Sequence, residues 1–199
     1  MQQQMSKLSI LPNYSIDIEI TYNPHNFALS NLFKMAARIN KKRQFLFVST
    51  VLGKHLAVRP QIPLLTGTLL AMLYQQHLTG QKIMASSVVK ALKDGGANLD
   101  VVQKSIEGTL ELTDETLFIG FAETATALGH AVFNAFHSNA MYIHTTREVL
   151  PDFEPFVTFE EEHSHATSHR IYTEEPEFLL QAKRIVLIDD EITTGEYGH

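Results

Sequence analysis

The residues best suited to chemistry follow the apolar run Arg184–Ile188 near the carboxyl end of the chain. Asp189, Asp190 and Glu191 come first, and small or hydroxyl-bearing residues follow: Ile192, Thr193, Thr194 and Gly195. Carboxylates at the end of a buried strand are costly unless they meet a cation or hydroxyl donors, whereas successive backbone N–H groups beside small side chains form an anion nest. Ribose 5-phosphate, which has vicinal hydroxyls and a phosphate, satisfies both halves of this loop. The alternative is an acid-rich strand end that only begins a loop.

Three further stretches carry groups suited to an anion or its surroundings. Lys54 and Arg59 place two cations on one loop, although a solvated basic loop explains them equally well. Arg147 stands beside two threonines, where it suits a phosphate or a base carbonyl, or else pairs with Glu148 or Asp152 for structure. The third stretch has small residues and one acid: Ala122, Glu123, Thr124 and Ala125.

The densest cluster of titratable groups is Glu160–Arg170. His163, His165 and His169 alternate along it, and imidazoles at alternating strand positions share a face and suit a metal ion. A surface hairpin without a catalytic part is the alternative.

Strands and helices that alternate along the chain must position these groups. Strands are expected where the residues form near-continuous apolar runs, at 44–49, 116–121, 140–144 and 184–188. Helices are expected at 64–93 with a break near Thr79 and Gly80, and at 98–108, 126–136 and 177–182. This alternation is typical of an α/β protein with a mostly parallel, twisted sheet flanked by helices on both faces. Ligands of such sheets bind at the carboxyl ends of the strands.

The amino-terminal part of the chain has a different pattern. Residues 1–26 alternate loosely and predict one edge strand with a turn at Asn23 and Pro24, and residues 27–42 have helical spacing. Thr113–Glu115 is expected to form a turn. Two units follow from this organisation: residues 1–110 as an α+β appendage that packs on the core like a hood, and residues 111–199 as the core.

The composition limits the classes of protein that fit. The 199 residues carry a net charge of −6 and include no cysteine. The charge argues against broad nucleic-acid or anionic-membrane binding, and the lack of cysteine excludes disulfides, thiolate catalysis and Cys-ligated zinc. Neither a signal peptide nor an apolar stretch of about 20 residues is present. A cytoplasmic soluble domain is therefore expected.

The loop at residues 184–195 resembles the 5-phosphoribosyl-1-pyrophosphate (PRPP) signature of type I phosphoribosyltransferases: an apolar strand, two acids, two variable positions and Thr-Gly. The resemblance implies that Asp189 and Asp190 hold the ribose hydroxyls and that residues 191–195 cradle the 5-phosphate. The stretch Gly120–Gly129 resembles the pyrophosphate loop of that fold, in which a non-proline cis peptide is common. Many members carry Lys or Arg where this chain has Thr124. The missing cation would come from other residues: Lys54, Arg59, Arg147 or Arg170. In that family the segment between the second core strand and the last one is a hairpin that closes over the reaction centre, which implies a lid at residues 160–170 with His165, His169 and Arg170 as its contacts.

A wider likeness points to one subgroup. The runs Phe47–Pro60, Gly120–Gly129, His144–Glu148 and Glu160–Arg170 resemble the phosphoribosyltransferase-like proteins of bacterial tellurite-resistance-type gene clusters. The likeness covers most of residues 40–195. The family pattern continues past Gly195 with a helix and strands, so the core is expected to be truncated at its carboxyl end.

The resemblance implies an activity, a metal and partners. A phosphoribosyl group would pass to or from a nitrogenous base with release of pyrophosphate, and Asp189, Asp190 and Arg147 would be the catalytic residues. Mg²⁺ would be the cofactor, held by Asp189 and Asp190 through water or substrate oxygens. The ligands would be PRPP and a base or nucleotide, and a homodimer is expected. The alternatives are a non-catalytic PRPP- or nucleotide-binding regulator and an inactive fragment of a larger enzyme.

Overall fold

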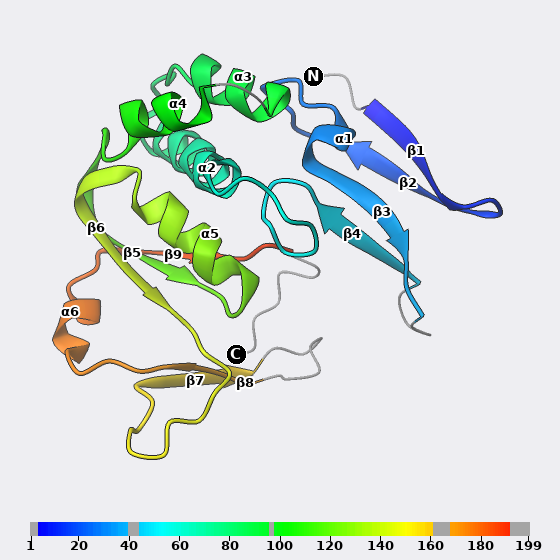
Figure 1. The fold of residues 1–199 in the computed structure, drawn as a ribbon. Coiled ribbons are helices and arrows are strands. Elements are labelled where there is room, and N and C mark those ends of the chain that lie inside the picture. The colour runs from blue at the N-terminus through cyan, green and yellow to red at the C-terminus, as the bar shows by residue number, and fades with distance from the viewer. Residues whose placement is uncertain (1–3, 40–43, 96–97, 161–167, 192–199) are drawn as a thin grey trace.

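The core of the protein is a small parallel sheet with the strand order β6-β5-β9. The computed structural model describes residues 4–39, 44–95, 98–160 and 168–191. Strand β5 (Leu110–Gly120) lies in the centre, between β6 (Phe136–His144) and β9 (Arg184–Ile188), and both pairings are parallel. Figure 1 shows the three strands running side by side through the middle of the molecule. The predicted α/β class with a parallel sheet is confirmed.

Helices cover one face of this sheet. Helix α5 (Thr124–Phe133) packs on β5 and β6, and α2 (Gln61–Thr79) packs on α5. Helices α3 (Ser86–Asp94) and α4 (Leu99–Ile106) pack on α2 and on each other (Figure 1). Helix α2 ends at Gly80, whose φ of 69° is left-handed and suits glycine. The predicted break at this position is confirmed.

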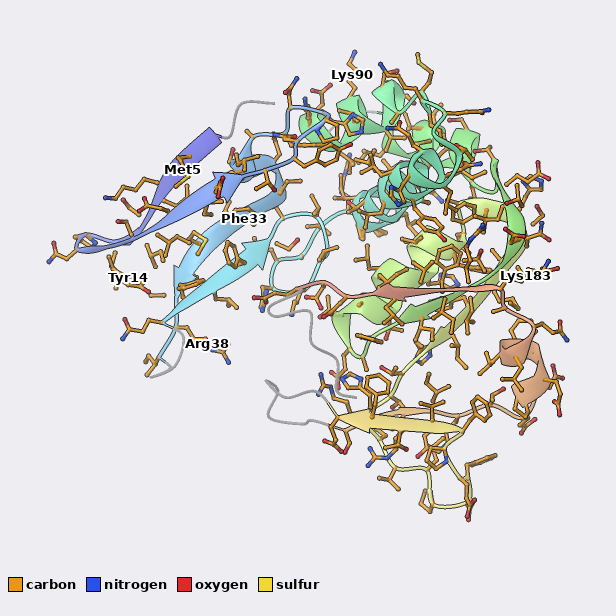
Figure 2. The ribbon with its side chains drawn as sticks, turned by 180° about the vertical axis from the view of Figure 1, so that it is seen from behind. Met5, Tyr14, Phe33, Arg38, Lys90 and Lys183 are labelled. Carbon is orange, nitrogen blue, oxygen red and sulfur yellow. The ribbon has the colours of Figure 1, made fainter. Side chains whose placement is uncertain are left out.

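The opposite face has a thinner cover. Strands β7 (Val157–Glu160) and β8 (Ser168–Ile171) form an antiparallel pair there, and α6 (Pro176–Leu180) precedes β9. On β9 the apolar side chains that face this way are open to solvent, since Ile185 is 62% and Leu187 50% exposed. In the view of Figure 2, β9 accordingly runs across the near side of the molecule. The expected cover on both faces is therefore incomplete over β9 in the described part of the chain.

The amino-terminal part differs from its predicted pattern. Residues 4–20 form two antiparallel strands, β1 (Gln4–Leu11) and β2 (Tyr14–Ile20), where one strand was expected. The predicted helix at 27–42 is only the short α1 (Leu29–Leu32), followed by β3 (Phe33–Ala37). Strand β3 pairs in antiparallel register with β4 (Phe45–Ser49). Pairing with a neighbouring strand outweighs the local helical spacing, because tertiary contacts override weak intrinsic propensities.

Two boundaries in the core also shift. The expected turn at 113–115 lies within β5, and the ladder between β5 and β6 changes register between Glu111 and Thr116. The polar residues therefore interrupt the pairing without ending the strand. Helix α5 begins at Thr124 and ends at Phe133, and Phe136 begins β6 instead of ending the helix.

Candidate functional site

Backbone hydrogen bonds join the carboxyl ends of the three core strands. The N–H of Phe121 donates to the carbonyl of Ile188 at 3.0 Å, and the N–H of Thr145 donates to the carbonyl of Gly120 at 3.0 Å. The loops that begin at residues 121, 145 and 189 therefore start side by side. Because all three strands are parallel, their polar loops share one edge of the sheet, which is where ligands of such sheets bind.

The acidic end of β9 is held by a lysine from the amino-terminal part. Asp189 accepts the backbone N–H of Asp190 through Oδ1 at 2.8 Å. Asp190 Oδ2 lies 2.7 Å from Nζ of Lys54, and the two side chains are 12% and 33% exposed. Glu191 is half-buried beside them, and the other members of the predicted phosphate loop, Ile192, Thr193, Thr194 and Gly195, lie outside the described residues.

The loop after β5 leads directly into helix α5. The peptide bond between Ala122 and Glu123 is cis, as the sequence resemblance led us to expect. Glu123 precedes the first helical residue, Thr124, and its side chain makes no capping hydrogen bond. Backbone N–H groups of the first helical turn are suited to an anion. Because the end of β5 is hydrogen-bonded to the end of β9, helix α5 begins at the same edge of the sheet as Asp189 and Asp190.

Arg147 brings a positive charge to this loop. Its Nη2 donates to the carbonyl of Ala122 at 3.2 Å, and that carbonyl belongs to the cis peptide. Thr124 itself carries no charge. Arg147, which follows the end of β6, places a guanidinium beside the loop instead. Arg59 is exposed next to the start of α2.

Two buried side chains support the loop from below. Thr145 is 1% and His169 2% exposed. Thr145 Oγ1 accepts the N–H of Ala122 at 2.8 Å and lies 2.9 Å from Nδ1 of His169. The imidazole is stacked on Phe159, with 5.1 Å between ring centroids and 5° between planes. Sequence reasoning gave Thr145 no structural part. The sequence signal for this contact was a threonine directly after a predicted buried strand, together with a histidine in the predicted hairpin.

Arg170 fastens the β7–β8 pair to the end of β6. Its backbone exchanges two hydrogen bonds of 2.8 Å with Thr146, and its Nη1 donates to the carbonyl of Arg147 at 3.0 Å. The structure thus brings Arg170 and His169 to the site edge, with His169 turned into the interior. His163 and His165 lie outside the described residues.

Two glycines let α5 approach the sheet closely. A Cβ at Gly129 would lie 2.8 Å from Cε2 of Tyr142 and 3.1 Å from Cα of Gly120. The Tyr142 hydroxyl donates to the carbonyl of Thr126 at 2.5 Å, and burial raises the pKa of this phenol to about 12. The glycines at both ends of the stretch 120–129 therefore set where the helix begins relative to the strand ends.

Comparison with known proteins agrees with this arrangement. A family model described as phosphoribosyl transferase matches residues 32–197. The chain belongs to this phosphoribosyltransferase family. No curated protein and no solved structure matches the chain.

The metal that phosphoribosyltransferases use fits the acidic pair only in part. Mg²⁺ takes hard oxygen ligands and is held by one or two carboxylates together with water and substrate oxygens. Asp189 and Asp190 supply such carboxylates at the strand end. Among the described residues, no group of three or more His, Asp or Glu side chains could hold a metal ion by itself. The donor set therefore suits a metal that arrives with substrate oxygens.

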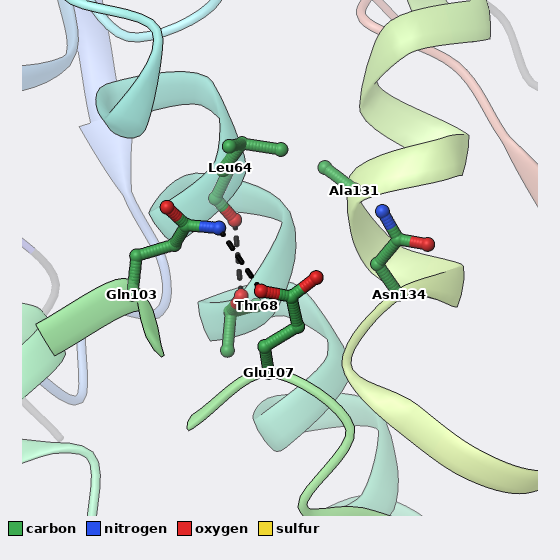
Figure 3. Close-up of a pocket in the computed structure, with 6 residues that line it drawn as sticks. All are labelled: Leu64, Thr68, Gln103, Glu107, Ala131 and Asn134. Carbon is green, nitrogen blue, oxygen red and sulfur yellow. Dashed lines mark hydrogen bonds between the residues drawn. The ribbon is translucent and has the colours of Figure 1, made fainter. Parts of the chain in front are cut away.

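Two other polar sites in this family member lie away from the strand ends. A cavity of about 10 Å³ between α2, α4 and α5 is lined by Leu64, Thr68, Gln103, Glu107, Ala131 and Asn134 (Figure 3). It holds no more than about one water.

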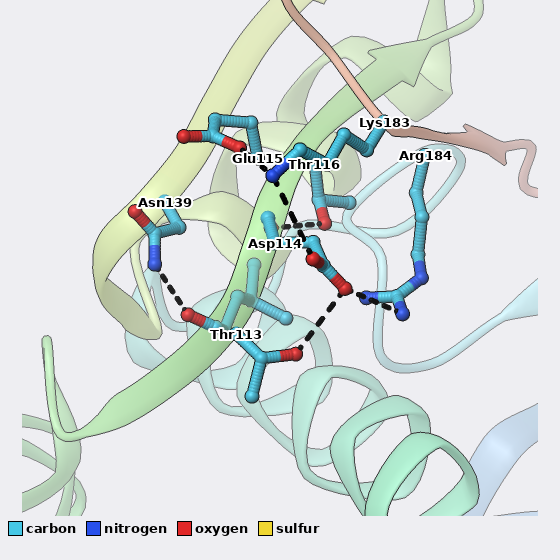
Figure 4. Close-up of polar contacts among 8 residues, drawn as sticks. Thr113, Asp114, Glu115, Thr116, Asn139, Lys183 and Arg184 are labelled. Carbon is cyan, nitrogen blue, oxygen red and sulfur yellow. Dashed lines mark hydrogen bonds and ion pairs between the residues drawn. The ribbon is translucent and has the colours of Figure 1, made fainter.

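At the opposite end of the strands, Arg184 pairs with Asp114 at 2.7 Å and Lys183 with Glu115 at 3.2 Å (Figure 4). These ion pairs tie the start of β9 to β5.

Of the helices that the structure describes, none has the length and apolar character needed to span a bilayer.

Proposed function

We propose that the chain binds PRPP with Mg²⁺ at the joined ends of β5, β6 and β9 and transfers the phosphoribosyl group to or from a nitrogenous base. The observation that carries the proposal is the meeting of the acidic end of β9 with the start of α5 at one sheet edge. Hydrogen bonds from Phe121 to Ile188 and from Thr145 to Gly120 hold that edge together. Membership of the phosphoribosyltransferase family supports it.

The carboxylates at the end of β9 receive the ribose. Asp189 and Asp190 accept hydrogen bonds from the two vicinal hydroxyls, which are the donors that a half-buried carboxylate needs. Asp190 already holds the ammonium of Lys54 at 2.7 Å, so a cation stands beside the bound sugar. Residues 191–195 cradle the 5-phosphate through backbone N–H groups.

The loop 122–125 receives the pyrophosphate. The first turn of α5 offers N–H groups, and Arg147 contributes the charge that Thr124 lacks, since its guanidinium already contacts the carbonyl of Ala122. Lys54 and Arg59 add positive charge from the amino-terminal part. The combination of oriented backbone N–H groups and cations stabilises a polyphosphate without further ligands.

The reaction is a displacement at the anomeric carbon. A ring nitrogen of the base forms the new C–N bond while the C–O bond to pyrophosphate breaks, and pyrophosphate leaves with the electron pair. The nitrogen then loses any proton it carries in excess. Positive charge develops on the ribose, and the carboxylates of Asp189 and Asp190 stabilise it, so positioning and electrostatics supply the acceleration. Mg²⁺, when bound, neutralises charge on the pyrophosphate oxygens.

The β7–β8 pair acts as a lid over the reaction centre, anchored through Arg170 and His169. The chain acts in the cytoplasm and forms a homodimer. It belongs to the subgroup found in tellurite-resistance-type gene clusters.

Calorimetric titration with PRPP and Mg²⁺ tests the function. The native chain should bind PRPP, and Asp189→Asn combined with Asp190→Asn should abolish binding while the circular dichroism spectrum stays unchanged. A matched control, Asp17→Asn with Asp152→Asn, removes the same two charges from exposed positions and should bind normally. Unchanged affinity in the Asp189 and Asp190 variant would refute the site. Binding without pyrophosphate release across a panel of bases would identify a PRPP-binding regulator.

A further inference from the structure

His169 is a buried imidazole that the chemistry of the proposed reaction does not use. The residue is 2% exposed. Its ring is stacked on Phe159, with centroids 5.1 Å apart, and contacts Phe121, with centroids 5.6 Å apart. A polar ring is costly to bury in such aromatic surroundings without hydrogen bonds. Its Nδ1 lies 2.9 Å from the hydroxyl of Thr145, so the ring both packs in the interior and holds a polar partner.

The hydroxyl of Thr145 carries this contact on to the loop after β5. It accepts the backbone N–H of Ala122 at 2.8 Å. A hydroxyl has one hydrogen and two lone pairs, so in either tautomer of His169 one lone pair remains for Ala122. The backbone N–H of Thr145 donates to the carbonyl of Gly120 at 3.0 Å, which fixes the threonine against the end of β5. A ring nitrogen on β8 therefore orients the hydroxyl that holds Ala122.

The carbonyl of Ala122 is also held by a chain of contacts that leads to β8. It accepts Nη2 of Arg147 at 3.2 Å, and the carbonyl of Arg147 accepts Nη1 of Arg170 at 3.0 Å. Between these residues, Thr146 and Arg170 exchange two backbone hydrogen bonds of 2.8 Å. Both polar backbone groups of Ala122 are thus held by the segment after β6, and consecutive residues of β8 hold that segment in turn.

Ala122 stands where the chain enters helix α5. Glu123 follows it, makes no capping hydrogen bond with its side chain, and precedes the first helical residue, Thr124. The described contacts hold this entry through the backbone of Ala122, which is 9% exposed. The N–H groups of the first helical turn face outward along the helix axis, so their position relative to a ligand depends on where the chain enters. A misplacement of about 1 Å is enough to cost roughly 100-fold in a reaction that depends on positioning.

We propose that His169 is a positioning residue for the pyrophosphate half of the site. Through Thr145 it holds the N–H of Ala122 and so fixes where the N–H groups at the start of α5 meet the pyrophosphate. The inference rests on the proposed function, which assigns the loop at residues 122–125 to pyrophosphate. A residue that only fills the interior would act through its ring, whereas a positioning residue acts through its ring nitrogen.

Two substitutions at His169 separate the nitrogen from the ring. His169→Phe keeps an aromatic ring for Phe159 and removes Nδ1, whereas His169→Asn loses the ring and keeps a polar atom where Nδ1 stood. We expect His169→Phe to bind inorganic pyrophosphate with Mg²⁺ about tenfold more weakly than the native chain, and His169→Asn to recover affinity to within about threefold. Calorimetric titration measures both, at a temperature where circular dichroism shows each variant folded. A role in packing alone predicts the reverse order, with His169→Phe close to native, and that result would overturn the proposal.

A second pair of variants covers the case in which His169→Phe does not fold. His169→Leu is close in size to His169→Asn and has no polar atom, so these two variants differ mainly in the hydrogen bond. The Asn variant should bind pyrophosphate more tightly than the Leu variant by about fivefold or more. Equal affinities would show that the hydrogen bond does not position the loop.

A double variant tests whether His169 acts through Thr145. His169→Phe combined with Thr145→Val should bind pyrophosphate no more than about twofold more weakly than Thr145→Val alone, because both changes break the same relay. Losses that multiply would show that His169 reaches the loop by another route, and the relay would be refuted.

Ribose 5-phosphate and an exposed histidine supply the controls. Ribose 5-phosphate meets the end of β9 in the proposed site, so its affinity should stay unchanged in every His169 variant, and a parallel loss would indicate general damage to the fold instead of positioning. His77→Phe makes the same substitution at an exposed position on α2 and should bind pyrophosphate normally. If the native chain binds neither pyrophosphate nor PRPP, the proposed function itself is wrong. If it binds both and His169→Phe keeps full affinity, only the role of His169 is wrong.

Discussion

Replacing Thr145 by valine removes one hydroxyl from the interior and changes little else in shape. The hydroxyl accepts the N–H of Ala122 at 2.8 Å and contacts Nδ1 of His169 at 2.9 Å. Valine leaves both groups without that partner at a site where Thr145 is 1% and His169 2% exposed. The loss of a hydrogen-bond partner by a buried polar group costs about 1–3 kcal/mol, and two groups lose one here. We expect the free energy of unfolding to fall by about 2–5 kcal/mol.

Urea unfolding followed by circular dichroism measures this loss, with the slope m checked for constancy. Thr145→Ser keeps the hydroxyl and should recover all but about 1 kcal/mol. Thr146→Val is the matched control, because the N–H of Glu148, which its Oγ1 accepts at 3.1 Å, is exposed, and the substitution should cost less than about 1 kcal/mol.

Ligand binding gives a second measurement on the same variants. The N–H of Ala122 belongs to the loop that we assign to pyrophosphate, so Thr145→Val should also weaken pyrophosphate binding under conditions where the variant is fully folded. If Thr145→Val unfolds at the same urea concentration as the native chain, the two hydrogen bonds contribute nothing and the support of the loop from below is refuted.

Two further predictions concern α5 and its contact with β6. Gly129→Ala should lower the melting temperature and cost about 1–3 kcal/mol, because its Cβ would lie 2.8 Å from Cε2 of Tyr142. An unchanged melting temperature would contradict the close packing. Gly95→Ala is the comparison, because its Cβ would meet none of the described atoms within 4 Å while its φ of 57° is left-handed, so it measures backbone strain without a collision. The pKa of Tyr142 is raised to about 12 by burial, against about 10 in an unfolded chain. The unfolded state therefore loses the proton first, and the free energy of unfolding should fall as the pH rises from about 10 towards 12. Tyr142→Phe should show a shallower fall over this range in urea unfolding at stepped pH, and an identical slope would exclude Tyr142 as its source.

Much of the core could be predicted from the sequence. The apolar runs that became the second half of β5, the end of β6 and all of β9 identify strands by themselves, because a strand buried in a parallel sheet needs apolar residues at successive positions. The left-handed Gly80 at the end of α2 likewise follows from local chemistry. The amino-terminal part could not be predicted in the same way, since β3 exists only because β4 pairs with it.

The sequence by itself determined the acidic run after β9 and the small-residue loop after β5. Because each follows an apolar run directly, the sequence also placed both at the carboxyl ends of strands. Only the tertiary structure decided which side chains reach them. Lys54 and Asp190 are 136 residues apart, Arg147 and Ala122 are 25 apart, and Thr145 and His169 are 24 apart. Local patterns encode the period and the ends of an element, whereas contacts between distant residues depend on how the elements pack. The cations and the buried support of the site therefore became visible only in the folded chain.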